Sequence, residues 1–151
     1  MLKYGQFRNM SEQQLVDCSQ AFDTFGCAGG LPSHSYEYIM YNGGLSEEVN
    51  YPYMGVDQNC SYKPEYKSIG VVGGSVNVSV SEPDMQLALF NNGPISVSFT
   101  VVPGFKDYHT GVYINATCPN GPLDVNHDVV AVGYGTSDEG VDYWVIKNSW
   151  G

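Results

Sequence analysis

The apolar pattern of this chain changes character near Lys67, and that change restricts the fold more than any other feature of the sequence. Before it, residues 11–20 and 34–44 carry helix signals, and the glycine-rich stretch at residues 25–33 separates them as a loop. After it, valine alternates with small polar residues, which is typical of half-buried strands. A chain that is helical first and mostly strand afterwards is predicted to be α+β, with a helical lobe and a β lobe.

The second half is predicted to hold four strand-like segments and one helix. The strand-like segments are residues 69–81, 94–102, 127–135 and 141–151, the last two joined by a turn at residues 136–140. The helix is predicted within residues 82–92, because Pro83 lies near its start and Gly93 comes after its end. The final strand-like segment reaches Gly151 with no closing element, which favours a chain that has been cut from a longer domain.

Composition excludes two classes of partner. With 16 acidic against 6 basic residues the chain has a net charge of −10, and no cluster of lysine and arginine is present to bind a phosphate backbone. No apolar run approaches the length of a membrane span. The first ten residues lack the apolar core of a secretory signal, so any such signal is expected outside this chain. We therefore expect no nucleic-acid partner and no membrane insertion, and the acidity itself serves solubility or an acidic compartment.

The four cysteines are widely spaced and fit neither zinc knuckles nor a redox C-x-x-C pair. Disulfide bonds in a protein of the secretory pathway are the better interpretation, with four free buried thiols as the alternative. Four N-x-S/T triplets agree with that compartment and are candidate glycosylation sites at Asn9, Asn59, Asn77 and Asn115. Lysosomal, vacuolar or extracellular localisation is the corresponding expectation.

His127 stands at the head of the apolar stretch DVNHDVVAVGYG, residues 124–135. A histidine at the start of a strand can titrate near neutral pH and serve as a catalytic base, but taken alone it is more often structural. His34 and His109 show no pattern of partners, and we interpret both as surface or packing residues. No arrangement of ligands suggests a metal, and no motif suggests another cofactor.

Six motifs, in order along the whole chain, resemble the papain family of cysteine peptidases. They are SEQQLVDC (11–18), GCAGGLPS (26–33), YPYMG (51–55), NGPISV (92–97), VNHDVVAVGYG (125–135) and YWVIKNSWG (143–151). GGLPS and DVNH favour the cathepsin H and aleurain-like branch. The resemblance implies a two-lobed papain-like fold, with residues 1–76 the remainder of the helical lobe and residues 77–151 most of the β-barrel lobe.

The resemblance also implies a mechanism in which a cysteine thiolate attacks the peptide carbonyl, a histidine pairs with it, and an asparagine orients the imidazole. His127 matches the family histidine and Asn148 the family asparagine. Trp150 matches the tryptophan that covers their hydrogen bond. The mechanism requires no cofactor and no metal.

Substrate contacts are implied at seven further positions. Gly29 and Gly30 match a backbone edge that pairs with extended substrate, for which unobstructed main chain is needed. The remaining matched positions are Leu31, Pro32, Ser98 and Val125 in the main specificity pocket, and Asn126 beside the histidine. Ordinary core packing is the alternative for Leu31 and Val125.

The nucleophile is not found in this sequence. The family signature C-G-[SA]-C-[WY] is absent, and counting back the usual separation of about 130 residues from His127 reaches a point before Met1. The flanks of Cys18 match a structural cysteine, which the resemblance pairs with Cys60. The resemblance gives Cys27 and Cys118 no partner within this chain, as expected of a fragment. We therefore expect these 151 residues alone to be inactive.

Asp128 departs from the small apolar residue usual after the family histidine. Since neighbours on a strand face opposite ways, we expect Asp128 to face inward without a partner, so that Asp128→Ala stabilises the fold. Two hypotheses remain: an active peptidase, or an inactive homologue that binds peptides or partners. If the protein is an active peptidase, we expect its partners to be peptide substrates, cystatin-type inhibitors and its own pro-segment. We also expect it to be a monomer.

Overall fold

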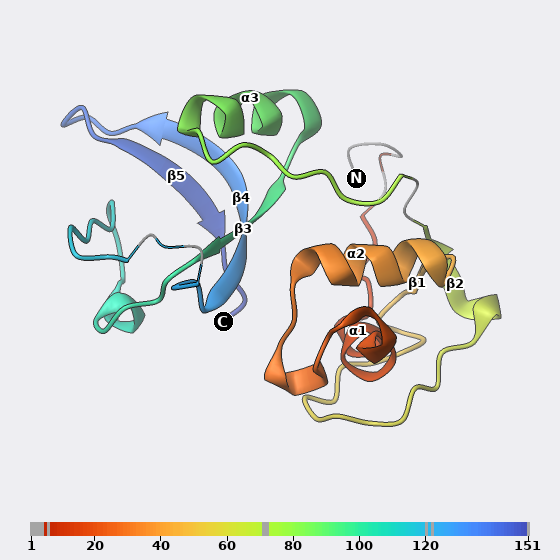
Figure 1. Cartoon of the computed structure of the whole chain (residues 1–151). Helices are drawn as coiled ribbons and strands as arrows, with labels where there is room; N and C mark the ends of the chain where they lie inside the picture. The colour runs from red at the N-terminus through yellow and green to blue at the C-terminus, as the bar shows by residue number, and fades with distance from the viewer. Residues whose placement is uncertain (1–4, 6, 71–72, 120, 122, 151) are drawn as a thin grey trace. The chain divides into compact units, whose positions relative to one another are not determined.

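The computed structural model describes residues 5, 7–70, 73–119, 121 and 123–150. The chain divides into two compact units, Met1–Asn77 and Val78–Gly151 (Figure 1). The first holds most of the helix and the second holds the larger sheet, so the predicted α+β class is confirmed.

The first unit is built on two helices and a short antiparallel strand pair. Its elements are α1 (Glu12–Cys18), α2 (Pro32–Tyr41), β1 (Leu45–Ser46) and β2 (Lys67–Ile69), with 3-10 turns at Gln20–Phe22, Gly26–Ala28 and Pro64–Tyr66. Both predicted helices are present. The first begins at the predicted N-cap, because the Ser11 side chain accepts a hydrogen bond from Gln14 N. The second ends at Tyr41 with Asn42 as its C-cap, and Gly43 follows in the left-handed region at φ 80°.

An apolar core lies between α2 and the strand pair of this unit. Tyr38, Ile39 and Leu45 are buried at its centre, and Phe22 and Ile69 pack against them. The disulfide Cys18–Cys60, which the family resemblance implies, joins the end of α1 to the long loop before β2. This bond closes a loop of 42 residues around a small core, which restricts the unfolded chain and so stabilises the unit.

The fully buried residues of α1 are polar, while Leu15 packs partly buried against the apolar core. Gln13, Gln14 and Asp17 are buried, and each is hydrogen-bonded. Gln13 Oε1 accepts from the backbone N–H of Met54 and Gly55 at 2.9 and 3.2 Å, and its Nε2 donates to Asp17 Oδ1 at 2.7 Å. These side chains therefore hold a loop that has no regular structure of its own.

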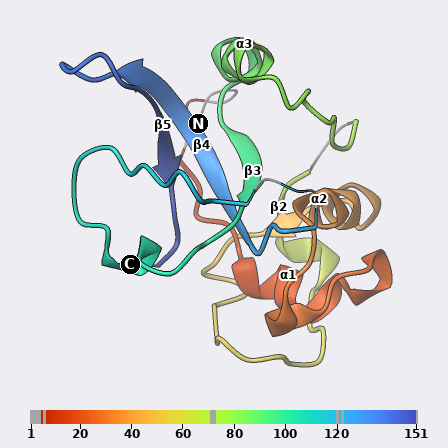
Figure 2. The same cartoon turned by 60° about the vertical axis from the view of Figure 1, so that its left-hand side comes forward.

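The second unit is a three-stranded antiparallel sheet with one helix against it. It contains α3 (Glu82–Asn92), β3 (Ile95–Phe99), a 3-10 turn (Phe105–Asp107), β4 (His127–Thr136) and β5 (Asp142–Lys147), in the sheet order β3-β4-β5. The helix packs on β4, where Leu89, Val129 and Ala131 are buried (Figure 2). The predicted helix and the last three predicted strands are all present, with ends that differ by a few residues.

The prediction of a strand over residues 69–81 is wrong for most of that range. Strand β2 ends at Ile69, residues 73–80 are irregular, and residues 71–72 lie outside the described part of the chain. Val76 is 87% and Val80 is 100% exposed. Alternation predicts a strand only where a neighbouring strand and a core receive the apolar face, and these valines have neither.

Candidate active site

His127 is the first residue of β4 and lies opposite Phe99 of β3. Its imidazole contacts the Phe99 ring edge-to-face, with the ring centroids 5.7 Å apart. The ring is partly buried, so that one face is packed while the histidine remains accessible. The start of the strand therefore fixes the position of the imidazole without enclosing it.

Asn148 fixes the orientation of that ring. It follows β5, and its Oδ1 lies 2.9 Å from His127 Nε2. The same oxygen accepts the backbone N–H of Ser149 at 2.8 Å, and a backbone N–H can only donate. The amide atom facing the imidazole is therefore the oxygen, so Nε2 carries the proton in the neutral ring and Nδ1 is the basic nitrogen.

Trp150 covers the His127 ring. The two rings are stacked with centroids 4.7 Å apart and an interplanar angle of 29°. Behind them, Phe105 contacts Trp150 at 5.8 Å and Phe99 at 5.1 Å, both edge-to-face. Sequence reasoning missed Phe99 and Phe105. The strand register that sets Phe99 opposite His127 is the only signal that could have found the first of them.

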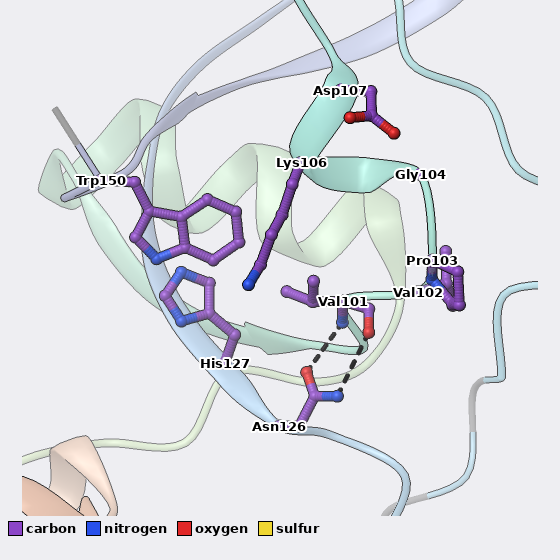
Figure 3. Close-up of a pocket in the computed structure, with 9 residues that line it drawn as sticks. All are labelled: Val101, Val102, Pro103, Gly104, Lys106, Asp107, Asn126, His127 and Trp150. Atoms are coloured by element: carbon purple, nitrogen blue, oxygen red, sulfur yellow. Dashed lines mark hydrogen bonds between the residues drawn. The ribbon is translucent and has the colours of Figure 1, made fainter.

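His127 and Trp150 line an open pocket of about 700 Å³. Figure 3 shows Lys106 reaching toward the two rings, while Asn126 hydrogen-bonds the main chain of Val101 through both amide atoms. The Lys106 ammonium lies 5.9 Å from the centroid of a Trp150 ring. The other lining residues are Val102, Pro103, Gly104 and Asp107.

The similarity of this sequence to known proteins extends over the whole chain. Residues 1–151 match the family described as papain family cysteine protease. The chain is 52% identical to oryzain gamma chain of Oryza sativa subsp. japonica over 95% of its length, and 45% identical to pro-cathepsin H of Mus musculus over 97%. It covers only 39% and 44% of those two relatives, so it spans about two fifths of their length.

Solved structures give the same result for the fold. A digestive procathepsin L 3 from the larval midgut of Tenebrio molitor superposes with a TM-score of 0.90 at 32% identity, over 99% of this chain and 48% of that one. The proform of the ragweed pollen allergen Amb a 11, a cysteine protease, gives 0.86 at 34% identity, over 99% and 44%. This chain belongs to the papain family of cysteine proteases. The predicted papain-like fold and the similarity to the cathepsin H and aleurain-like branch are confirmed.

The papain-family positions next to the histidine are not all brought to the pocket. Asn126 lines the pocket, whereas Val125 is exposed and is not among the described residues that line it. Ser98 lies directly opposite Asp128, one residue along from the Phe99–His127 pair, and so on the other face of the strands. The Ser98 hydroxyl donates a hydrogen bond to the Asp128 carboxylate.

The prediction that Asp128 is buried without a partner is therefore wrong. The carboxylate is exposed and hydrogen-bonded to Ser98. Alternation correctly separates Asp128 from the His127 face, but it does not say whether the opposite face is covered. The expected stabilisation by Asp128→Ala loses its basis, because no desolvation cost is present to be relieved.

The glycine motif of the papain family forms a tight loop in the first unit. Gly30 is bridged to Thr24, and the Gly29 carbonyl accepts the backbone N–H of Phe25 at 2.7 Å. A Cβ on Gly30 would lie 3.0 Å from the Thr24 Cβ, so any larger residue there would require Thr24 to shift by a few tenths of an ångström. Leu31 is exposed and Pro32 begins α2.

The two free cysteines are both exposed. Partial desolvation, followed by the Asp57 carboxylate, raises the pKa of the Cys27 thiol, and the Cys27 backbone N–H donates to Asp57 at 2.8 Å. A raised pKa disfavours the thiolate that a nucleophile needs. No cysteine is among the described residues that line the His127 pocket.

The remaining predicted positions are on the surface or partly buried. Asn9, Asn59 and Asn77 are exposed, whereas Asn115 is partly buried and its Nδ2 donates to Tyr113. His109 is exposed, and His34 is partly buried with its Nδ1 3.2 Å from the Asp23 carbonyl oxygen. Across the described ranges, no cluster of ligating side chains could hold a metal ion. No described helix is long and apolar enough to cross a membrane.

Proposed function

We propose that this chain supplies the base, His127, and the orienting amide, Asn148, of a cysteine-peptidase centre. One observation carries the proposal: His127 Nε2 lies 2.9 Å from Asn148 Oδ1. The backbone N–H of Ser149 donates to the same oxygen. That arrangement leaves Nδ1 free to accept a proton. The nucleophilic cysteine would come from a part of the protein outside this chain.

The chemistry proposed for His127 has two steps. Nδ1 takes the proton of the cysteine thiol, and the resulting ion pair favours the thiolate that attacks the peptide carbonyl. The imidazolium then gives that proton to the nitrogen of the leaving amine as the C–N bond breaks. Water hydrolyses the acyl-enzyme thioester, with His127 again acting as base, which restores the free thiol.

Trp150 and Asn148 would act by holding the imidazole. Stacking at 4.7 Å restricts rotation of the ring, and the indole shields the Nε2–Oδ1 hydrogen bond from water. Trp150 is itself 48% exposed, so the cover is partial in this chain.

The two units would correspond to the two lobes, with residues 1–76 from the helical lobe and residues 77–151 from the β lobe. The glycine pair Gly29-Gly30 would pair with extended substrate, and Leu31, Pro32, Val125 and Asn126 would line substrate subsites. Ser98, which faces Asp128, has less support as a pocket residue.

The cellular setting belongs to the same proposal. The secretory-pathway features, namely the disulfide and the exposed asparagine triplets, support a lysosomal, vacuolar or extracellular protein. Several superposed structures are proforms, which supports an inhibitory pro-segment in the full protein. Peptides, cystatin-type inhibitors and a monomeric state complete the proposal.

The test begins with the full-length transcript and with expression of the complete reading frame. A segment encoding Q-x-x-x-C-G-x-C-W upstream and in frame would supply the nucleophile. The complete protein should then hydrolyse fluorogenic peptides, a thiol-directed inhibitor should block it, and His127→Ala should lower kcat/KM by at least about a thousandfold. His109→Ala, an exposed histidine outside the pocket, is the matched control and should leave kcat/KM within about twofold.

The 151-residue chain alone should show no such hydrolysis. A complete protein that binds peptides but cleaves none would overturn the peptidase proposal in favour of an inactive peptide-binding homologue.

A further inference from the structure

We propose that Lys106 makes the pocket beside His127 a binding site for a carboxylate on the leaving-group side of the substrate. This inference rests on the peptidase function proposed above and adds a substrate preference to it. The carboxylate would belong either to an acidic side chain next to the cleaved bond or to the free C-terminus of a short leaving peptide.

The charge distribution of the second unit singles out this lysine. Residues 78–151 contain eight acidic residues and only two basic ones, Lys106 and Lys147. Lys106 lines the pocket with His127, and Lys147 lies at the end of β5. Asp107 also lines this pocket, so the attraction for an anion is confined to the side that the Lys106 ammonium reaches, beside His127 and Trp150.

The Lys106 ammonium has no carboxylate partner in the described part of the chain. It forms no salt bridge there, and it lies over the face of Trp150, 5.9 Å from a ring centroid. Figure 3 shows its side chain extending toward His127 and Trp150, whereas the neighbouring Asp107 carboxylate points away from both. The ammonium is therefore positioned over the pocket with its hydrogen-bond donors available.

The rest of the pocket does not compete for the same role. The Asn126 amide is engaged with Val101, accepting its N–H at 2.8 Å and donating to its carbonyl at 3.3 Å. Val102, Pro103 and Gly104 offer apolar side chains and main chain. Such a lining can pack against the methylenes of a glutamate while Lys106 binds the carboxylate.

The proposed chemistry places this pocket on the leaving-group side. His127 gives its proton to the leaving amine, so the residues that follow the cleaved bond are those closest to the imidazole. A pocket that shares His127 and Trp150 with the base therefore receives those residues. An ammonium in it forms a charge-assisted hydrogen bond to a carboxylate and only a weaker one to a neutral amide.

The test compares matched peptides with the complete peptidase that contains this chain. The peptides differ only after the cleaved bond: glutamate against glutamine in a longer, amidated peptide, and free carboxylate against amide in a dipeptide leaving group. We expect kcat/KM to be about three- to tenfold higher for the carboxylate in at least one of the two pairs, since the site is partly exposed. The pair that shows the ratio identifies the source of the carboxylate, and raising the salt concentration should reduce it.

Variants of Lys106 test whether this residue causes the ratio of kcat/KM between the carboxylate and amide peptides. Lys106→Met should bring it close to one, and Lys106→Glu should invert it. Lys147→Met, which removes the other lysine of the unit, is the matched control and should preserve the ratio. Equal kcat/KM for carboxylate and amide in both pairs, or a ratio that survives Lys106→Met, would overturn the proposal.

A binding experiment separates this inference from the proposed function. If no peptide is hydrolysed, the peptidase proposal fails, and calorimetric titration of the same peptides into the protein still tests Lys106. Tighter binding of the carboxylate peptide by about three- to tenfold, lost in Lys106→Met, would support a carboxylate site in a protein without peptidase activity. Equal affinities would overturn the site as well.

Discussion

At the scale of single residues, the site depends on one oxygen atom that accepts two hydrogen bonds. Asn148 Oδ1 accepts from Ser149 N and from His127 Nε2, which selects one tautomer of the imidazole. Asn148→Ala should therefore change the neutral ring from the Nε2–H form to a mixture of tautomers, as measured by the ¹⁵N chemical shifts of the His127 ring. Ser149→Ala keeps its backbone N–H and should keep the single tautomer, whereas a single tautomer in both variants would contradict this role of Asn148.

Asp128 gives a second prediction at this scale. Because it is exposed and paired with Ser98, Asp128→Ala should lower the free energy of unfolding slightly, by about 0–1 kcal/mol. Chemical denaturation of Asp128→Ala, Ser98→Ala and the double variant measures the coupling directly. A clear stabilisation by Asp128→Ala would show that the carboxylate is under a desolvation cost after all.

The residues of the site differ in how far the sequence could predict them. His127, Asn148 and Trp150 were recognisable because they stand in continuous motifs, and the structure brings the three together. Lys106 belongs to no motif, and its place over Trp150 depends on the chain between β3 and β4 returning to the end of β5. Such a contact is set by tertiary structure, which local pattern does not encode.

At the scale of elements, α1 is held by hydrogen bonds from its buried polar side chains, with Leu15 packed against the apolar core. Gln13→Ala would leave the part-buried backbone N–H groups of Met54 and Gly55 without their acceptor and the buried Asp17 without a donor. We expect a loss of about 3 kcal/mol in the free energy of unfolding, measured by urea denaturation. Gln20→Ala, an exposed glutamine two residues beyond α1, is the control and should cost less than about 0.5 kcal/mol.

A cluster of Arg8, Glu47 and Ser68 links the N-terminal segment to both short strands of the first unit. Glu47 accepts from Ser68 Oγ at 2.6 Å and pairs with Arg8 at 2.7 Å. The hydrogen bond from Ser68, and then Arg8, lower the pKa of Glu47 below its usual value of 4.5. A lowered pKa in the folded state means that stability is present above the unfolded pKa and is lost as the pH falls through the folded value.

Glu47→Gln should therefore lower Tm at about pH 7, and the difference from the native chain should shrink as the pH falls below about 4. Because Glu47 is only partly buried, the shift in Tm should be small. Thermal unfolding across this pH range is the measurement. A difference in Tm that stays constant with pH would assign the effect to packing instead of charge.

The elements themselves were predictable where a local signal marks their ends. Ser11 marks the start of α1 and Gly93 marks the end of α3, since each satisfies backbone groups that the helix leaves unpaired. The irregular structure of residues 73–80 was not predictable, because alternating valines indicate a preference for extended backbone and not the presence of a partner strand. The polar interior of α1 was also missed, since Gln13, Gln14 and Asp17 have the composition of a solvated face.

At the scale of the whole molecule, the two units are joined by an exposed, irregular segment that includes residues 73–80. An elastase-type protease should cut first here, close to Val76 or Val80. The disulfide Cys18–Cys60 lies entirely in the first unit, so the two fragments should separate on a gel without reducing agent. Mass spectrometry of the first products, from unglycosylated protein, locates the cut, and a first cut near Leu123, which is 96% exposed, would contradict this prediction.

The stacking of His127 on Trp150 has a consequence for observing the molecule. An imidazolium in face contact with an indole quenches its fluorescence, and the neutral ring does so far less. With centroids 4.7 Å apart, the emission of Trp150 should therefore follow the protonation of the one histidine it covers. The second tryptophan, Trp144, lies on β5 against Tyr134, and its emission alone would be measured in Trp150→Phe. The protein thus carries a built-in optical probe of its own candidate base, readable without a label and without a substrate.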